Sequence, residues 1–295
     1  MAVSRIAIVG VGAIGTTISV HLARTRRHAI TLCARSPIDE LSLTTGEREL
    51  RERLPCITAP AAAPEVDWIL LATKAHQTAA AGAWLEAMAR PETSIAVLQN
   101  GVDHEDRVRP FAGAATIVPV IVNCPVDRLA SGRARQRGPA RLTVRDDEPG
   151  ARFASLAEGS ELEVARASDF TTAAWTKLVL NAVGGAITAL TDRPNGVFRR
   201  ADVGALGTAM MLEIIRVGRA EGAKLDDALA DATVAALQAG SPDGTPSILQ
   251  DRRAGRPLEH DARNGVVVRL GRKHGIPTPL CEMAATLLAA SSRDE

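Results

Sequence analysis

The chain has 295 residues, 46% of them hydrophobic, and carries a net charge of +1 from 35 basic and 34 acidic residues. This length allows two domains, each with a core of its own. The balanced charge and the absence of tyrosine argue against nucleic acid or an anionic membrane as a partner. No run of about 18 uninterrupted apolar residues occurs, so no membrane span is expected.

The cysteines are scattered along the chain without a C-x-x-C spacing, at Cys33, Cys56, Cys124 and Cys281. Such a distribution is typical of isolated, reduced thiols in a cytoplasmic protein. We therefore expect neither a disulfide framework nor a metal site.

Apolar runs alternate with helical patterns in the first part of the chain. Strands are predicted at 4–9, 29–35, 67–74, 94–100 and 115–123, and helices at 13–26 and 76–89. Short extended pieces are expected within 41–58, and further strands at 140–146 and 161–165 flank a helix near 149–158. This alternation predicts an α/β fold with a mostly parallel, doubly wound sheet.

After about residue 168 the pattern becomes helical. Helices are predicted at 176–190, 201–222, 225–238, 258–274 and 279–291. The sequence therefore predicts a Rossmann-type domain over 1–168, followed by an all-helical domain over 169–295.

A glycine-rich stretch follows the first predicted strand and opens the first helix, with the spacing Gly10-x-Gly12-x-x-Gly15. Gly10 would allow a tight turn, Gly12 a close approach of the backbone to a pyrophosphate, and Gly15 close packing of the helix on the strand. Ala13 and Ile14 complete the turn, and the phosphates would lie at the positive end of the helix. The alternative, a glycine-rich turn without a ligand, is weakened by the strands and helix around it.

The end of the second strand bears on the choice of cofactor. A carboxylate at this point would hold the ribose 2′-hydroxyl of NAD, but the sequence has Cys33-Ala34-Arg35-Ser36. Arg35 can pair with a 2′-phosphate, and Ser36 can add a hydroxyl donor. These residues favour NADP(H) over NAD, unless Arg35 is simply a solvated loop residue.

Two polar residues close later strands, Lys74 after "WILLAT" and Asn100 after "SIAVLQ". Ligands of open parallel sheets bind beyond the carboxyl ends of the strands, so both are expected near the cofactor. Asn100 precedes Gly101 and could instead serve only a turn. His76 and His104 are expected in surface or loop positions.

The helix predicted at 176–190 has an unusual polar side. At about 100° per residue, one side collects Lys177, Asn181, Gly184, Gly185 and Thr188, and the other collects Val179, Leu180, Val183, Ala186, Ile187 and Leu190. Two helix-interior glycines cost about 2 kcal/mol relative to alanine, so the small polar side needs an explanation. We expect it to line a cleft between the two domains.

These elements resemble the ketopantoate reductase (2-dehydropantoate 2-reductase) family over nearly the whole chain. The resemblance rests on "GVGAIG", "LLATKAHQ", "LQNGVD", "AAWTKLVLNAVGGAITAL" and "PSILQDRRAGRPLEHDARNG". The most specific parts are Lys-x-x-x-Asn at Lys177 and Asn181, and Ser-x-Leu-x-Asp from Ser247 with Glu259 eight residues past the aspartate.

The resemblance implies a cytoplasmic enzyme of pantothenate biosynthesis, monomeric or homodimeric, that reduces a 2-oxo acid with NADPH. It implies that Lys177 is the catalytic lysine and Glu259 a substrate-binding acid in the catalytic site. Asn100, Asn181 and Ser247 are then substrate contacts, Lys74 lies near cofactor and substrate, and Arg35 holds the 2′-phosphate.

The chemistry of these side chains is compatible with that implication. Hydride delivery to a ketone leaves a developing alkoxide, which a positioned ammonium can stabilise and protonate. Each residue also has a simpler explanation: Lys177 could extend from a buried helix to water, Ser247 could be a helix N-cap, and Glu259 could be an acid in a first helical turn.

One departure from the family concerns the substrate. Family members often carry a second asparagine eight residues after the lysine, followed by proline, where this chain has Gly185 and Ala186. An enlarged pocket is expected there, which would favour a different acid. A reductase for another 2-oxo or hydroxy acid, and a sensor that binds NADPH without catalysis, are the alternatives.

Overall fold

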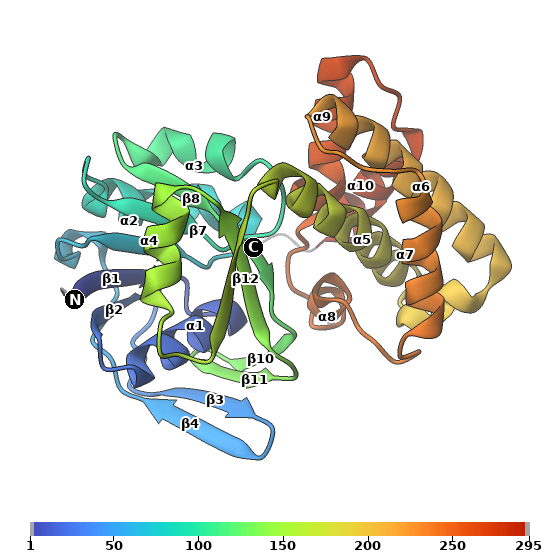
Figure 1. The fold of residues 1–295 in the computed structure, drawn as a ribbon. Coiled ribbons are helices and arrows are strands. Elements are labelled where there is room, and N and C mark those ends of the chain that lie inside the picture. Colours follow the sequence, from blue (N-terminus) through green and yellow to red (C-terminus); the bar gives the residue numbers. More distant parts are fainter. Residues whose placement is uncertain (1–2, 293–295) are drawn as a thin grey trace. The chain divides into compact units, whose positions relative to one another are not determined.

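The computed structural model describes residues 3–292, and the chain divides into two compact units, Met1–Phe170 and Thr171–Glu295. We call them unit 1 and unit 2 and describe each by itself (Figure 1). Unit 1 holds all the strands of the described chain, and unit 2 is helical. The predicted fold class, a Rossmann-type sheet followed by a helical region, is confirmed.

The central sheet of unit 1 has six parallel strands in the order β5-β2-β1-β6-β7-β8. The chain moves from β1 outward in one direction and then returns to place β6 on the other side of β1. This reversal creates a switch point beside β1, beyond whose carboxyl end ligands of such sheets bind. The strands are β1 (Ser4–Val9), β2 (His28–Cys33), β5 (Cys56–Ile57), β6 (Trp68–Leu71), β7 (Ser94–Val97) and β8 (Thr116–Pro119).

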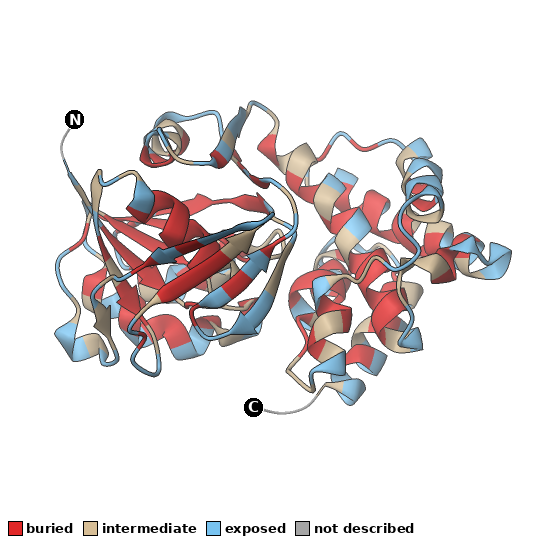
Figure 2. Cartoon of the chain, turned by 90° about the horizontal axis from the view of Figure 1, so that it is seen from below, coloured by how far each residue is buried: buried red, intermediate tan, exposed pale blue. Residues whose placement is uncertain are grey.

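Alternation of side chains along the central strands creates two cores, one on each face of the sheet. Ile6 and Ile8 join a cluster that includes side chains of α1 (Ala13–Arg24) and α4 (Glu148–Leu156). Ala7 and Val9 join the opposite cluster, with α2 (Thr78–Met88) and α3 (His104–Ala112). Burial on both faces explains why these strands are continuous apolar runs (Figure 2).

Two smaller sheets complete unit 1. The four-stranded sheet has the order β10-β11-β3-β4, and its central pair, β11 with β3, is parallel and joins Arg133 to Ser42. The three-stranded sheet has the order β13-β12-β9. Their strands are β3 (Leu41–Thr45), β4 (Arg48–Glu52), β9 (Ile121–Asn123), β10 (Val126–Ala130), β11 (Arg133–Gln136), β12 (Ala140–Arg145) and β13 (Leu162–Ala167).

Several predicted boundaries differ from the structure. The strand expected at 115–123 is interrupted at Val120, because β8 pairs with β7 whereas β9 pairs with β12 in another sheet. Helix α3 was not predicted, and Pro110 inside it weakens the helical pattern. The β10–β11 hairpin was also not predicted, since its exposed residues are mostly polar and lack an apolar alternation.

Unit 2 is built around α5 (Phe170–Thr191). The remaining α-helices are α6 (Ala201–Ala220), α7 (Ala228–Ala239), α8 (Ser247–Arg253), α9 (Val266–His274) and α10 (Pro279–Ser291). A π-helical turn, η4 (Asp261–Gly265), leads directly into α9. The described residues also form short 3₁₀ turns: η1 (Pro60–Ala62) and η2 (Ala75–Gln77) in unit 1, and η3 (Asn195–Arg199) in unit 2. The predicted helix at 258–274 therefore begins later and with a wider turn, and α8 was not predicted.

Close packing within unit 2 explains the apolar character of α5. By length and hydropathy alone this helix could cross a membrane, with a mean hydropathy of 1.3 in its most apolar window. However, 67% of that window is buried, and Trp175 is only 3% exposed. A Cβ added at Gly218 of α6 would lie 2.9 Å from the Trp175 ring, so α6 approaches α5 through a glycine. This burial is the pattern of a core helix (Figure 2).

Candidate functional site

Three glycines shape the turn between β1 and α1. Gly10 has φ +97°, and a Cβ there would lie 2.7 Å from Thr73 Cγ2, so this position needs glycine for both conformation and space. A Cβ at Gly15 would lie 2.0 Å from the carbonyl oxygen of Gly10. At Gly12 a Cβ would meet no atom within 4 Å, so the backbone here borders open space.

The N-terminus of α1 has the properties of an anion site. Gly12 is the N-cap, and neither a side-chain cap nor an acidic residue occurs in the first turn among the described residues. Ala13 and Ile14 are partly exposed, and the first-turn amides carry the positive end of the helix dipole. Open backbone at Gly12 and uncapped amides together fit a phosphate group.

Arg35 and Ser36 are exposed just beyond the carboxyl end of β2, the neighbour of β1. Many other arginines of unit 1 form ion pairs, as Arg51 does with Glu40 and Glu49. No hydrogen bond or ion pair of Arg35 is found within residues 3–292. Its guanidinium is therefore available to an external anion.

The Cys33 thiol closes β2 and is buried. Burial raises its pKa to about 12, because the anionic thiolate would lose its hydration. Cys33 is therefore a packed thiol and not a nucleophile, although it precedes Arg35 by only two positions.

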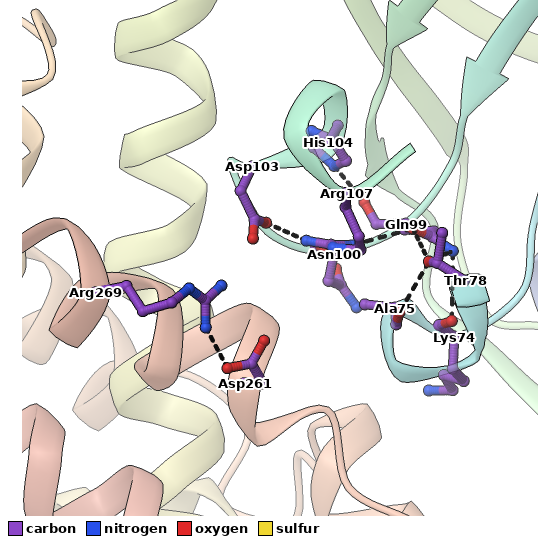
Figure 3. A network of polar contacts seen from close by, with 10 residues as sticks. All are labelled: Lys74, Ala75, Thr78, Gln99, Asn100, Asp103, His104, Arg107, Asp261 and Arg269. Carbon is purple, nitrogen blue, oxygen red and sulfur yellow. Dashed lines mark hydrogen bonds and ion pairs between the residues drawn. The ribbon is translucent and has the colours of Figure 1, made fainter. Parts of the chain in front are cut away.

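Gln99 links the loops that follow β6 and β7 (Figure 3). Its side-chain amide nitrogen lies 3.0 Å from Thr73 Oγ1, 3.3 Å from the carbonyl oxygen of Lys74 and 2.9 Å from Thr78 Oγ1. Lys74 is therefore held by its backbone, while its side chain is only partly buried. Thr73 also lies against Gly10, so the loop after β6 borders the predicted nucleotide site.

The same network fixes the backbone at Asn100. Arg107 Nη1 donates to Gln99 Oε1 at 3.0 Å and to the carbonyl oxygen of Asn100 at 3.2 Å, and Arg107 also pairs with Asp103. The predicted loop position of His104 is wrong: it begins α3, is 2% exposed, and its Nε2 donates to the carbonyl oxygen of Gln99 at 2.8 Å. Sequence reasoning missed Gln99, His104 and Arg107 because their role depends on loops brought together by the sheet.

In unit 2, Lys177 and Asn181 are partly buried one turn apart on α5. The predicted division of this helix into two sides is wrong at two positions. Leu180 is 42% exposed, whereas Thr188 is fully buried and donates its hydroxyl to the Gly184 carbonyl at 2.7 Å. Thr188 thus satisfies its polar group within the helix and contributes nothing to a ligand site.

A buried arginine joins three of the predicted site residues. Arg263 Nη1 donates to the carbonyl oxygen of Asn181 at 3.0 Å, and Nη2 donates to Ser247 Oγ at 2.9 Å. Nη2 also lies 3.8 Å from Glu259 Oε2, and both side chains of this ion pair are almost fully buried. Asn181, Ser247 and Glu259, far apart in the sequence, therefore meet around one guanidinium.

The structure excludes the N-cap role for Ser247 but not the helix-start explanation for Glu259. Ser247 is the first residue of α8, and the N-cap is Pro246. Glu259 stands immediately before the helical segment that begins at His260, where an acid is also favourable to the helix N-terminus. In the same π-helical turn, Asp261 pairs with Arg269 of α9 (Figure 3).

The enlarged pocket expected at Gly185 is wrong. A Cβ at this position would lie 2.9 Å from Arg263 Nη1 and 2.9 Å from Ile248 Cγ2. The space is filled by protein, chiefly by the guanidinium. Arg263 was not predicted because only the tertiary fold brings it to Gly185; the unexplained glycine in α5 was the available signal.

Two family models match this chain, one over most of unit 1 and one over unit 2. The family model "Ketopantoate reductase PanE/ApbA" matches residues 6–148, and "Ketopantoate reductase PanE/ApbA C terminal" matches residues 169–292. The chain is 39% identical over 290 residues to a 2-dehydropantoate 2-reductase of Caulobacter vibrioides, covering 97% of this chain and 99% of that protein. It is 40% identical over 289 residues to one of Mycobacterium tuberculosis, covering 97% of each.

Solved structures agree with these sequence relatives. The 2-dehydropantoate 2-reductase of Geobacter metallireducens superimposes with a TM-score of 0.90 at 26% identity, over 98% of this chain and 100% of that one. Both family models and full-length relatives thus cover the two units together. The chain belongs to the ketopantoate reductase family of oxidoreductases.

Proposed function

We propose that this protein reduces 2-dehydropantoate to pantoate with NADPH. Residues 1–168 would bind the cofactor, and residues 169–295 would supply the groups that act on the acid. The observation that carries the proposal is the gathering of Asn181, Ser247 and Glu259 around Arg263. Of these residues, Asn181 lies on α5, the helix that also holds Lys177. The relatives in Caulobacter vibrioides and Mycobacterium tuberculosis, named for this activity, support the choice of substrate.

The residues of unit 1 fit a phosphorylated dinucleotide. The uncapped N-terminus of α1 and the open backbone at Gly12 suit a pyrophosphate, with Gly10, Ala13, Ile14 and Gly15 forming the rest of the turn. The exposed Arg35 suits a 2′-phosphate, which supports NADP(H) over NAD. Lys74 and Asn100, held through Gln99, would contact the nicotinamide end and the substrate.

NADPH supplies the hydride that reduces the ketone. Lys177 would place its ammonium on the carbonyl oxygen, stabilise the developing alkoxide and donate the proton that completes the hydroxyl group. The side-chain amide of Asn181, one turn along α5, can hydrogen-bond the same small ligand. The Ser247 hydroxyl would orient the carboxylate of the substrate, and the Glu259 carboxylate would orient its hydroxyl group.

The test is a substrate panel with the purified full-length protein. Initial rates of NADPH oxidation are measured with 2-dehydropantoate, pyruvate, 2-oxobutyrate and benzoylformate, and kcat/KM is compared. We expect 2-dehydropantoate to give the highest value. A higher kcat/KM for another acid would show that 2-dehydropantoate is not the preferred substrate. No turnover with any acid would contradict the proposed function.

A further inference from the structure

Arg263 is a buried cation whose bonding is incomplete. Its Nη atoms bond Asn181 and Ser247, but its buried Nε has no hydrogen-bond partner within the described residues. A buried guanidinium is costly unless it is paired, and its ion pair with Glu259 is long at 3.8 Å. A charge held in this way is poorly explained by stability alone, which suggests that it acts on its neighbours.

The direction of the Arg263–Ser247 hydrogen bond has a consequence for the hydroxyl. A guanidinium can only donate, so Ser247 Oγ must be the acceptor in this bond. The hydroxyl hydrogen of Ser247 is then left to donate to another group, and Ser247 is exposed although Arg263 is 2% exposed. Ser247 therefore presents an O–H donor backed by a positive charge, which suits a carboxylate oxygen.

Gly185 provides the room for this arrangement. The guanidinium lies where a side chain at residue 185 would project, at 2.9 Å from the position of a Cβ. By contrast, a Cβ at Gly184 would make only ordinary contacts, 3.9 Å from Leu180 and 4.0 Å from Leu237. The two adjacent glycines therefore differ sharply in what they accommodate.

We propose that Arg263, seated against Gly185, is a positioning residue that holds Ser247 as a hydrogen-bond donor for the carboxylate of the 2-oxo acid. This inference rests on the proposed reductase function and adds to it a residue that acts through Ser247. Arg263 itself need not touch the substrate. The same guanidinium fixes Glu259 and the Asn181 backbone in one cluster.

The test is a double-mutant cycle between Arg263 and Ser247, with KM, kcat and NADPH affinity measured for each variant. Arg263→Met should raise KM for the acid about tenfold or more, the effect of losing a charged hydrogen bond, with NADPH affinity unchanged. Arg263→Lys should lose less, because it keeps a charge and donors. In a Ser247→Ala background, Arg263→Met should raise KM little further, because the partner is already absent.

Gly185→Ala tests the same idea without removing the charge, and it covers the case in which Arg263→Met fails to fold. Its Cβ would lie 2.9 Å from the end of the Arg263 side chain and 2.9 Å from Cγ2 of the buried, β-branched Ile248. The guanidinium is the more mobile of the two groups, so it should be displaced and KM should rise. Gly184→Ala is the matched control and should leave KM unchanged.

The outcomes separate the two proposals. If the folded wild type reduces no 2-oxo acid and does not bind oxamate, an unreactive analogue, in the presence of NADPH, the proposed function fails and this inference with it. If the wild type is active but Arg263→Met and Gly185→Ala leave KM unchanged, or the effects of Arg263→Met and Ser247→Ala on KM are fully additive, only the role of Arg263 is overturned.

Discussion

In the proposed mechanism, Lys177 and Arg263 would perform two different tasks. A guanidinium cannot be deprotonated in a protein, so Arg263 can orient neighbours but cannot donate a proton to an alkoxide. An ammonium can do so, and Lys177 lies one turn from Asn181, whose carbonyl binds Arg263. The arginine is buried and the lysine is partly exposed, which is compatible with the two proposed tasks.

Replacing Lys177 tests the proton donor. Lys177→Ala should lower kcat by about 10²–10⁴-fold, the usual effect of losing a general acid. NADPH affinity should change little, because the proposed cofactor residues belong to unit 1. With Lys177 intact, the rate should fall as the pH rises through the pKa of its ammonium in the complex, since only the protonated form donates.

The matched control is Lys224→Ala, which removes an exposed lysine of the same unit. It should retain the wild-type rate. A Lys177→Ala enzyme that keeps more than about a tenth of kcat would remove this lysine from the general-acid role.

Arg35 determines the cofactor in the proposal, and it can be tested alone. Arg35→Ala should weaken NADPH binding by about 1.5–3 kcal/mol, the contribution of a hydrogen bond to a charged group. Binding of NADH, which lacks the 2′-phosphate, should barely change and serves as the internal control. The affinities of the variant and the wild type are measured by titration with NADPH and with NADH. Equal losses of affinity for the two nucleotides would show that Arg35 does not recognise the 2′-phosphate.

In the turn between β1 and α1, Gly15 is needed for packing, whereas Gly12 is proposed to leave room for the cofactor. Gly15→Ala would force a Cβ to within 2.0 Å of the Gly10 carbonyl oxygen, so the turn must open. Gly12→Ala places its Cβ in open space at φ −82°, which alanine tolerates. The two variants carry the same added methyl group.

Gly15→Ala should therefore destabilise the protein by roughly 1–3 kcal/mol or more, as overpacking does. Gly12→Ala should keep the wild-type free energy of unfolding but bind NADPH at least about tenfold more weakly, because the methyl occupies space near the pyrophosphate. Urea unfolding and NADPH titration measure the two effects. Normal NADPH binding by Gly12→Ala would contradict the assignment of this turn.

The elements that could be predicted from the sequence are those whose apolar residues are spaced as their burial in the fold requires. The central strands are buried on both faces, so their apolar runs reveal them, and the glycine spacing identifies the β1–α1 turn. Helix α3 contains Pro110, and the buried positions of β11 are an alanine and a glutamine, so neither element shows a strong apolar pattern. The contact of Arg263 with Gly185 arises only when α5 and η4 pack together, which no local rule describes.

The free cysteines of the chain differ in how deeply the folded protein buries them. Cys33 and Cys281 are buried, whereas Cys56 and Cys124 are partly exposed. Burial raises the pKa of Cys33 to about 12 and raises that of Cys281 well above its usual range. The folded state thus holds protons that the unfolded chain releases above about pH 9, so the free energy of unfolding should fall as pH rises from there.

This alkaline loss of stability is measurable because the chain has no tyrosine to titrate in the same range. Urea unfolding between pH 8 and pH 11, roughly the span over which a thiol is released, should show a steeper fall for the wild type than for Cys33→Ala. Cys124→Ala, at a partly exposed position, is the control and should follow the wild-type slope. An identical slope for Cys33→Ala and the wild type would contradict the shifted pKa.

The parallel pairing of β3 with β11 has a consequence for synthesis on the ribosome. Strand β3 ends at residue 45 and β11 begins at residue 133, so 88 residues (133 minus 45) must be added before the partner exists. At bacterial and eukaryotic elongation rates this delay is roughly 4–18 s, far longer than a hairpin needs to form. Because β4 is the outer strand of this sheet, the β3–β4 hairpin of the nascent chain has both edges unpaired until β11 covers β3. Ribosome-associated chaperones are expected to bind it during that interval.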